Sequence, residues 1–171
     1  MLELLPFEEV YRRHADDVFR FCLFQLRDVA AAEDVAADTF VSAFAEYERI
    51  SPPEDKVRVW LIRIARNDVI DHKRRAQRWR LVMIKLQRER HIAVSEVDGL
   101  AGTSEDLAEV LEAMRDLSER DRLLVSLRCA ADLSFDEVGK VAGMSTKNAT
   151  TATRRALERL RSKEGIAHAR R

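Results

Sequence analysis

Basic side chains gather in a stretch that could bind a nucleic-acid strand. After an apolar helical segment, the chain interleaves cations with an amide and an indole ring: Arg63, Arg66, Asn67, Lys73, Arg74, Arg75, Arg78, Trp79 and Arg80. Guanidinium groups hold phosphates, and aromatic and amide groups can hold unstacked bases, so the pattern is typical of a surface that tracks a single strand. A solvated helix end with favourable charges near its C-terminus explains the same residues without a ligand.

A second basic segment follows a sequence typical of a helix-turn-helix. In residues 133–145, Ser134 and Glu137 match a capping box, Gly143 permits a left-handed turn, and Ser145 caps the next helix. That helix would enter the major groove of duplex DNA. Its candidate DNA contacts are Ser145, Lys147, Asn148, Thr150, Thr151, Arg154 and Arg155. The same spacing also occurs in ordinary helical hairpins.

The charges alternate along the chain although the formal net charge is zero. Residues 1–50 hold 5 basic and 11 acidic side chains, and residues 54–92 hold 12 basic and 5 acidic ones. Residues 93–145 hold 5 and 12, and residues 146–171 hold 8 and 2. Each basic block could neutralise phosphates, while the acidic blocks are expected to face protein.

Other chemistry finds little support in the sequence. The four His residues lie on different segments and pair with no Cys or carboxylate at ligand spacing, so no metal site is expected. No phosphate-binding loop or nucleophile motif occurs, and we expect no enzyme activity, no cofactor and no small-molecule substrate. Cys22 and Cys129 lie in apolar helical patterns and are expected to be reduced core thiols. The sequence shows neither a signal peptide nor a transmembrane span, which favours a cytoplasmic protein without membrane insertion.

The composition predicts an all-α fold, with few Gly and Pro and many helix formers. We expect two small helical domains, covering residues 1–92 and 105–165, joined by a flexible linker at 93–104 and followed by a basic tail at 166–171. Helices are predicted at about 7–26, 31–47, 56–80, 105–116, 119–130, 135–141 and 146–163. In the second of these, the predicted buried stripe is Val35, Phe40, Val41 and Phe44.

The chain resembles the extracytoplasmic-function (ECF) branch of bacterial sigma-70-type sigma factors over about residues 7–80 and 105–163. Besides the helix-turn-helix, three stretches account for the resemblance: Phe7-Glu8-Glu9-Val10-Tyr11-Arg12-Arg13-His14, Ala32-Glu33-Asp34-Val35-Ala36-Ala37-Asp38-Thr39-Phe40 and Trp60-Leu61-Ile62-Arg63-Ile64-Ala65-Arg66-Asn67. It implies a region 2-like domain followed by a region 4-like domain, with core RNA polymerase and promoter DNA as partners and an anti-sigma factor as a possible further one.

The resemblance also assigns roles to individual residues. Asp34, Asp38 and Phe40 match the motif that grips the clamp helices of the large polymerase subunit, and the C-terminal domain would bind the flap of the other large subunit. Asn67 stands where the family reads a flipped base of the melted −10 element, since an amide offers both a donor and an acceptor. A buried structural Asn is the alternative for this position. Arg63, Arg66, Arg74 and Arg75 would hold the phosphates of that strand.

The chain departs from the family pattern in its recognition helix. Thr150, Thr151 and Ala152 replace the usual Lys or Arg, Ser and Arg, so bidentate guanine recognition is lost there. Ser51-Pro52-Pro53-Glu54-Asp55-Lys56 replaces the usual −10 loop sequence, and Ala37 stands where Gln is frequent. The expected function is that of a sigma factor in promoter recognition and transcription initiation. A sigma-like decoy for an anti-sigma protein and a polymerase-independent helix-turn-helix regulator are the alternatives.

Overall fold

The computed structural model describes the backbone of residues 5–90 and 104–169, and the side chains of residues 5–86 and 104–162. Within those ranges the chain is helical and has no strand, as the sequence predicts. The elements are α1 (Phe7–Leu26), α2 (Val29–Ile50), the 3₁₀ turn η1 (Glu54–Lys56), α3 (Val57–Arg90), α4 (Glu105–Ala113), the 3₁₀ turn η2 (Met114–Asp116), α5 (Glu119–Val125), the π-helical turn η3 (Ser126–Ala130), α6 (Phe135–Ala142) and α7 (Thr146–Ala169). Of the predicted linker, only Ser104 lies within the described residues.

Short-range signals set the ends of the first three helices. Pro6 precedes α1, and Arg27 ends it in the left-handed conformation. Asp28 then caps α2 by accepting a hydrogen bond from the Ala31 amide at 2.8 Å. Ser51 ends α2, again with a positive φ, and Pro52 and Pro53 follow it because proline cannot continue the helix. The chain therefore reverses twice and packs α1, α2 and α3 side by side.

The predicted helix-turn-helix forms as expected. Ser134 and Glu137 make both hydrogen bonds of the capping box at the start of α6. Gly143 ends α6 with a φ of 72°, a conformation that costs a glycine little. Gly139 is needed for a different reason, because a Cβ atom there would lie 2.8 Å from the Met144 carbonyl oxygen. Two glycines thus permit α6 and α7 to approach closely.

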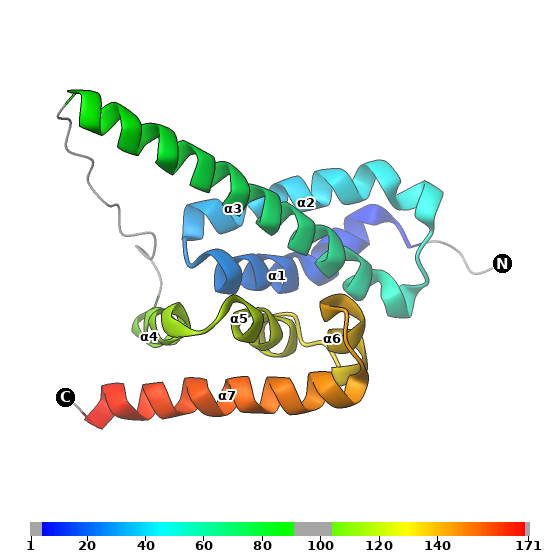
Figure 1. Ribbon diagram of the computed structural model, residues 1–171. Helices are drawn as coiled ribbons and strands as arrows, with labels where there is room; N and C mark the ends of the chain where they lie inside the picture. The colour runs from blue at the N-terminus through cyan, green and yellow to red at the C-terminus, as the bar shows by residue number, and fades with distance from the viewer. Residues whose placement is uncertain (1–4, 91–103, 170–171) are drawn as a thin grey trace.

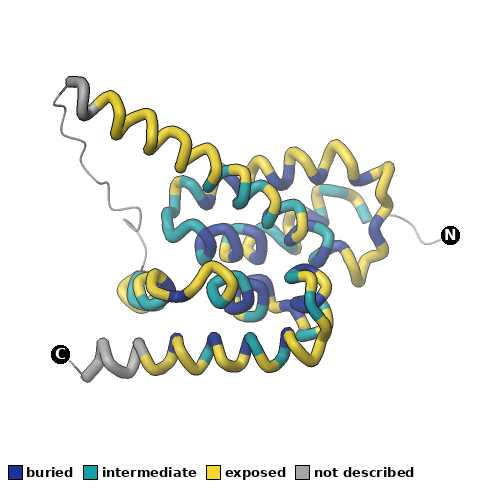
Figure 2. The backbone as a smooth tube through the Cα atoms, in the orientation of Figure 1, coloured by how far each residue is buried: buried dark blue, intermediate teal, exposed yellow. Residues whose placement is uncertain are grey.

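The N-terminal and C-terminal helices form two layers that share one core (Figure 1). α1, α2 and α3 make the first layer, and α4 to α7 make the second, with α1 and α3 in contact with the second layer. Buried apolar side chains of α1, such as Val18 and Phe21, belong to the same cluster as Leu124 and Leu127 of the second layer. Figure 2 shows this buried zone running through the middle of the molecule. Hydrophobic burial therefore holds the layers together as well as each layer internally.

Two sequence expectations about burial are wrong. Val41 and Phe44 were expected in the buried stripe of α2, but they are 71% and 66% exposed. The buried side of α2 instead follows Val35, Thr39 and Ala43, at four-residue spacing. Cys129 is exposed, whereas Cys22 is buried as expected. Phe44 meets the Phe7 ring at the start of α1, with ring centres 5.2 Å apart, but this contact leaves most of its side chain exposed.

Candidate nucleic-acid interface

The predicted single-strand residues lie on one helix, α3, but differ in accessibility. Asn67 is exposed, which excludes the alternative of a buried structural Asn. Arg74, Arg75 and Arg78 are exposed as well, and Arg74 makes an ion pair with Asp71 at 3.5 Å. The amide of Asn67 and the three guanidinium groups are therefore accessible from solvent. The three arginines line a cleft of about 500 Å³ with Asp38 and Val41 of α2, so a strand could run along this side of α3.

Two further arginines of this group face the second layer. Arg63 Nη2 donates to the Lys140 carbonyl oxygen at 3.5 Å, and Arg66 Nη1 donates to the Val141 carbonyl oxygen at 3.3 Å. Both carbonyls belong to the last turn of α6, where the helix dipole favours cations. Arg63 and Arg66 are thus occupied by the helix-turn-helix unit in this arrangement, a contact that the sequence did not predict.

Lys73 is half-buried between the two layers. It lines a groove of about 560 Å³ together with Arg66, Glu119 and Arg120. Burial lowers the pKa of Lys73, Glu119 raises it, and the positive charges of Arg122 and Arg27 lower it again. Burial therefore disfavours the charged form of Lys73, and an anion in the groove would stabilise it.

The predicted major-groove residues lie on the first three turns of α7. Lys147, Asn148, Thr151 and Arg155 line a cleft of about 280 Å³, with Arg120 of α5 on its other side. These side chains present two cations, an amide and a hydroxyl to one surface. That combination suits contact with phosphates and base edges.

Three other candidates on this helix are held by local contacts. Thr150 Oγ1 donates to the Thr146 carbonyl oxygen at 2.8 Å, so its hydroxyl is used within the helix. Ser145 Oγ accepts from the backbone N–H of Asn148 at 3.3 Å as an N-cap. The Arg154 guanidinium lies 5.9 Å from the centre of the Phe135 ring on α6, a cation–π distance. Arg154 is exposed, so it is both positioned and accessible.

The α2 residues assigned to polymerase binding divide into exposed and buried ones. Asp34 and Asp38 are exposed. Phe40 is only 7% exposed and packs edge-on against Tyr11, with ring centres 4.8 Å apart, so its ring belongs to the core. Val41 and Phe44, which sequence reasoning placed in the core, provide the exposed apolar side chains of this face. The docking surface that α2 offers is therefore acidic and apolar, but it does not include Phe40.

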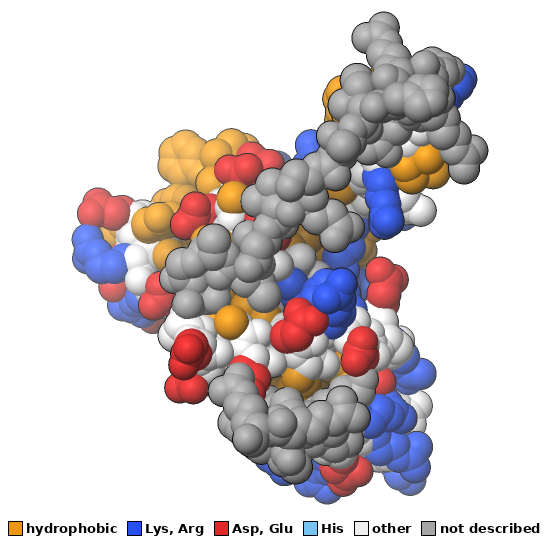
Figure 3. All heavy atoms as spheres, turned by 90° about the vertical axis from the view of Figure 1, so that its left-hand side faces the viewer, with side chains coloured by type: hydrophobic (Ala, Val, Ile, Leu, Met, Phe, Trp, Pro, Cys, Tyr) orange, Lys and Arg blue, Asp and Glu red, His pale blue; other side chains and the backbone are white. Residues whose placement is uncertain are grey.

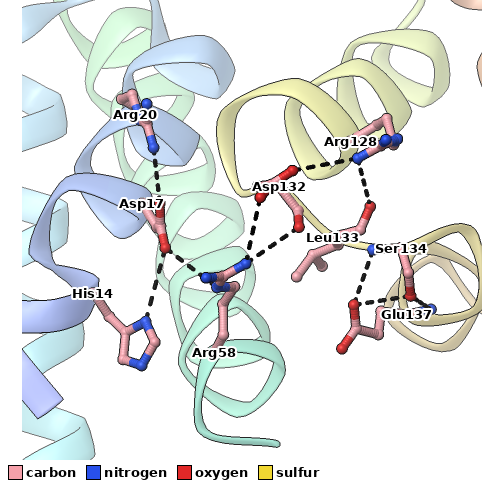
Figure 4. A network of polar contacts seen from close by, with 9 residues as sticks. All are labelled: His14, Asp17, Arg20, Arg58, Arg128, Asp132, Leu133, Ser134 and Glu137. Carbon is pink, nitrogen blue, oxygen red and sulfur yellow. Dashed lines mark hydrogen bonds and ion pairs between the residues drawn. The ribbon is translucent and has the colours of Figure 1, made fainter. Parts of the chain in front are cut away.

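A polar network joins the two layers near the start of α3 (Figure 4). Arg58 Nε lies 3.3 Å from Asp17 Oδ2, and Arg58 Nη1 donates to the Asp132 carbonyl oxygen at 3.3 Å. Asp132 has a φ of 51° and also pairs with Arg128 at 3.4 Å. His14 Nδ1 lies 3.8 Å from Asp17, and burial lowers the pKa of His14, with Arg58 lowering it further. One guanidinium thus bridges a carboxylate of α1 and the turn before α6.

Other kinds of site are not found in the described ranges. Residues 5–86 and 104–162, whose side chains the structure describes, hold no group of three His, Cys, Asp or Glu side chains that could bind a metal. None of the helices described has an apolar stretch long enough to cross a bilayer.

Comparison with known proteins identifies the family of this chain. Residues 10–79 match Sigma-70 region 2, and residues 113–162 match Sigma-70, region 4. The ECF RNA polymerase sigma factor SigM of Bacillus subtilis is 28% identical over 159 residues, which cover 92% of this chain and 94% of SigM. The chain belongs to the ECF branch of the sigma-70 family.

A further relative supports this family assignment, and a solved structure shares the fold. The ECF RNA polymerase sigma factor SigC of Mycobacterium tuberculosis is 34% identical over 127 residues, or 74% of this chain and 66% of SigC. The fold matches that of the sigma factor RpoE of Bartonella quintana, solved with the anti-sigma factor NepR, with a TM-score of 0.72 and 20% identity. The match covers 94% of this chain and 97% of RpoE. Region 2 thus corresponds to α1–α3, and region 4 begins at the end of α4 and includes the helix-turn-helix.

Proposed function

We propose that this sigma factor, a transcription initiation factor, directs RNA polymerase to promoters by binding two forms of DNA. Melted −10 strand would run along α3, where Asn67 reads a flipped base and Arg74, Arg75 and Arg78 hold phosphates. The −35 duplex would bind at the cleft of α7 through Lys147, Asn148, Thr151, Arg154 and Arg155. The observation on which the proposal rests is that Asn67 is exposed among exposed arginines, while a separate polar cleft lies on α7.

Docking on polymerase would use the exposed face of α2. Asp34 and Asp38 offer negative charge, and Val41 and Phe44 offer apolar surface that is mostly exposed. Such a face suits a basic, partly apolar partner, as the clamp helices of the large polymerase subunit would be. The flap of the other large subunit would bind the C-terminal helices. Catalysis would then belong to the polymerase, and the sigma factor would act in the cytoplasm by supplying binding energy.

Full use of the α3 surface requires the two layers to separate locally. Arg63 and Arg66 donate to α6 carbonyls, so they can hold strand phosphates only after α6 moves away from α3. Binding to polymerase and to two promoter elements at once would compensate for the lost contacts. An anti-sigma factor is a further proposed partner, because RpoE, which shares the fold, was solved with one.

A reconstituted transcription assay tests the proposal. Core polymerase with this protein should start RNA synthesis at defined promoters, and Asn67→Ala should reduce initiation at least tenfold while leaving binding to core polymerase unchanged. Val41→Glu should instead reduce binding to core polymerase, since this side chain is 71% exposed.

The same assay separates the alternatives. A decoy would bind its partner but give no promoter-dependent RNA, and Asn67→Ala would change nothing. A polymerase-independent regulator would bind duplex DNA tightly in the absence of polymerase, and its region 2 surface would have no role. Either result would contradict the proposal.

A further inference from the structure

The distal half of α3 extends away from the body of the molecule (Figure 1). Every residue from Arg74 to Leu86 is exposed, which Figure 2 shows as a continuous exposed segment of the helix. This segment is nevertheless rich in large apolar side chains: Trp79, Leu81, Val82, Met83, Ile84 and Leu86. A row of this kind that no other described residue covers marks a surface for another molecule.

Four of these side chains form a single stripe on the helix. Trp79, Val82, Met83 and Leu86 follow the i, i+3, i+4, i+7 spacing of one helical face, and we call them the distal stripe. Trp79 is 67% exposed and Val82 is 48% exposed. A stripe of this width and spacing is the surface that packs against one other helix.

The distal stripe continues the face by which α3 packs into its own domain. Trp79 follows the fully buried Leu61 by 18 residues, or about five turns, and Met83 follows the fully buried Ala65 by the same interval. The two halves of α3 thus present the same side, but only the proximal half has α1 and α2 beneath it. The match to Sigma-70 region 2 ends at residue 79, so most of the stripe lies beyond the shared sequence.

The charge around the stripe selects the kind of partner. From His72 to Leu86 there is no Asp or Glu, whereas six side chains are basic: Lys73, Arg74, Arg75, Arg78, Arg80 and Lys85. Figure 3 shows Lys and Arg side chains beside apolar ones where the molecule narrows toward its upper end. A second copy of this chain would bring like charges together, whereas a helix with acidic flanks would have opposite charges at both edges.

We propose that the distal stripe binds an amphipathic helix of a partner protein, with an apolar stripe flanked by Asp and Glu. A nucleic-acid strand would use the cations but leave Val82, Met83 and Leu86 without a role. A lipid surface could also cover the stripe. A helix that lies on a membrane has a polar opposite face, however, whereas the opposite face here carries Leu81 and Ile84. This inference does not depend on promoter recognition.

Trp79 provides the signal for the test. The full chain with Trp60→Phe retains Trp79 as its single tryptophan, since the sequence holds two. The probe is a synthetic helix of heptad repeats with Leu at the core positions and Glu on the flanks, and its control has Lys in place of Glu. The acidic helix should shift Trp79 emission to the blue, and the basic helix should not.

Paired substitutions on opposite sides of α3 decide the outcome. Val82→Glu with Leu86→Glu should weaken binding of the acidic helix at least tenfold. Leu81→Glu with Ile84→Glu adds the same charge on the other side and should leave the affinity within about twofold. Equal binding of both synthetic helices, or an equal effect of both variants, would overturn the proposal. So would a shift seen only with phosphatidylglycerol vesicles or only with oligo(dT).

Discussion

Gln25 Nε2 donates a hydrogen bond to Ser126 Oγ across 2.8 Å, although the two residues are 101 positions apart. Both side chains are buried, Gln25 on α1 and Ser126 at the start of the π-helical turn η3. Ser126 Oγ also donates to the Arg122 carbonyl oxygen at 2.7 Å, so the serine hydroxyl both donates and accepts a hydrogen bond. The contact fixes the region 4 layer against α1, beside the apolar side chains that the two layers share.

Ser126→Ala is expected to lower the free energy of unfolding by about 1–3 kcal/mol, because the Gln25 amide is left buried without its acceptor. Chemical denaturation of the full chain measures this change. Gln25→Leu combined with Ser126→Ala removes both polar groups and should cost less than the sum of the single changes. Additive costs would show that the two side chains do not interact in solution.

Gly139→Ala is expected to be more damaging than Gly143→Ala. The added Cβ at residue 139 would meet the Met144 carbonyl oxygen at 2.8 Å, and a backbone atom in a tight turn cannot move aside without shifting α7. At residue 143 the space is open, and the cost is limited to the positive φ, about 1–2 kcal/mol. Urea midpoints and duplex binding measure the loss of stability and of DNA affinity in each variant. A larger loss for Gly143→Ala than for Gly139→Ala would contradict the prediction.

Thr150 and Arg155 are expected to differ in their effect on duplex DNA binding. Thr150→Ala should change affinity less than twofold, since its hydroxyl already bonds to the Thr146 carbonyl. Arg155→Ala should weaken binding of many sequences alike and reduce the slope of log affinity against log salt by about 1, as for a lost phosphate contact. Titrations of promoter DNA with the holoenzyme at several salt concentrations provide the measurement. A strong sequence-dependent effect of Thr150→Ala would place its hydroxyl on the DNA.

The protein is expected to lose stability as the pH falls below about 6.5, the ordinary pKa of His. Burial and the nearby Arg58 lower the pKa of His14 in the folded state. The unfolded chain therefore takes up a proton that the folded chain does not, so the free energy of unfolding rises with pH in this window and falls on acidification. His14→Gln should flatten this part of the profile. Denaturation curves at about pH 7.5 and about pH 5.5 measure the difference in the free energy of unfolding. If this difference is the same in His14→Gln as in the unchanged chain, other groups cause the effect.

The sequence by itself determined the features that depend on neighbours within a few residues. The caps at Ser134 and Ser145 and the left-handed turn at Gly143 form between groups at most four positions apart, so they are visible in the chain and confirmed in the structure. The all-α class and the membership of the ECF sigma factors follow from the same kind of local pattern.

Only the tertiary structure decided which side of each helix is covered. Apolar character suggested burial for Val41 and Phe44, but burial requires a helix that covers the whole side chain, and both stay mostly exposed even though the Phe7 ring of α1 contacts Phe44. Likewise, Arg63 and Arg66 were predicted for DNA, yet the carbonyls that they meet come from α6, more than 70 residues away. Such contacts depend on how distant elements pack together, and the residue types at one position do not specify that packing.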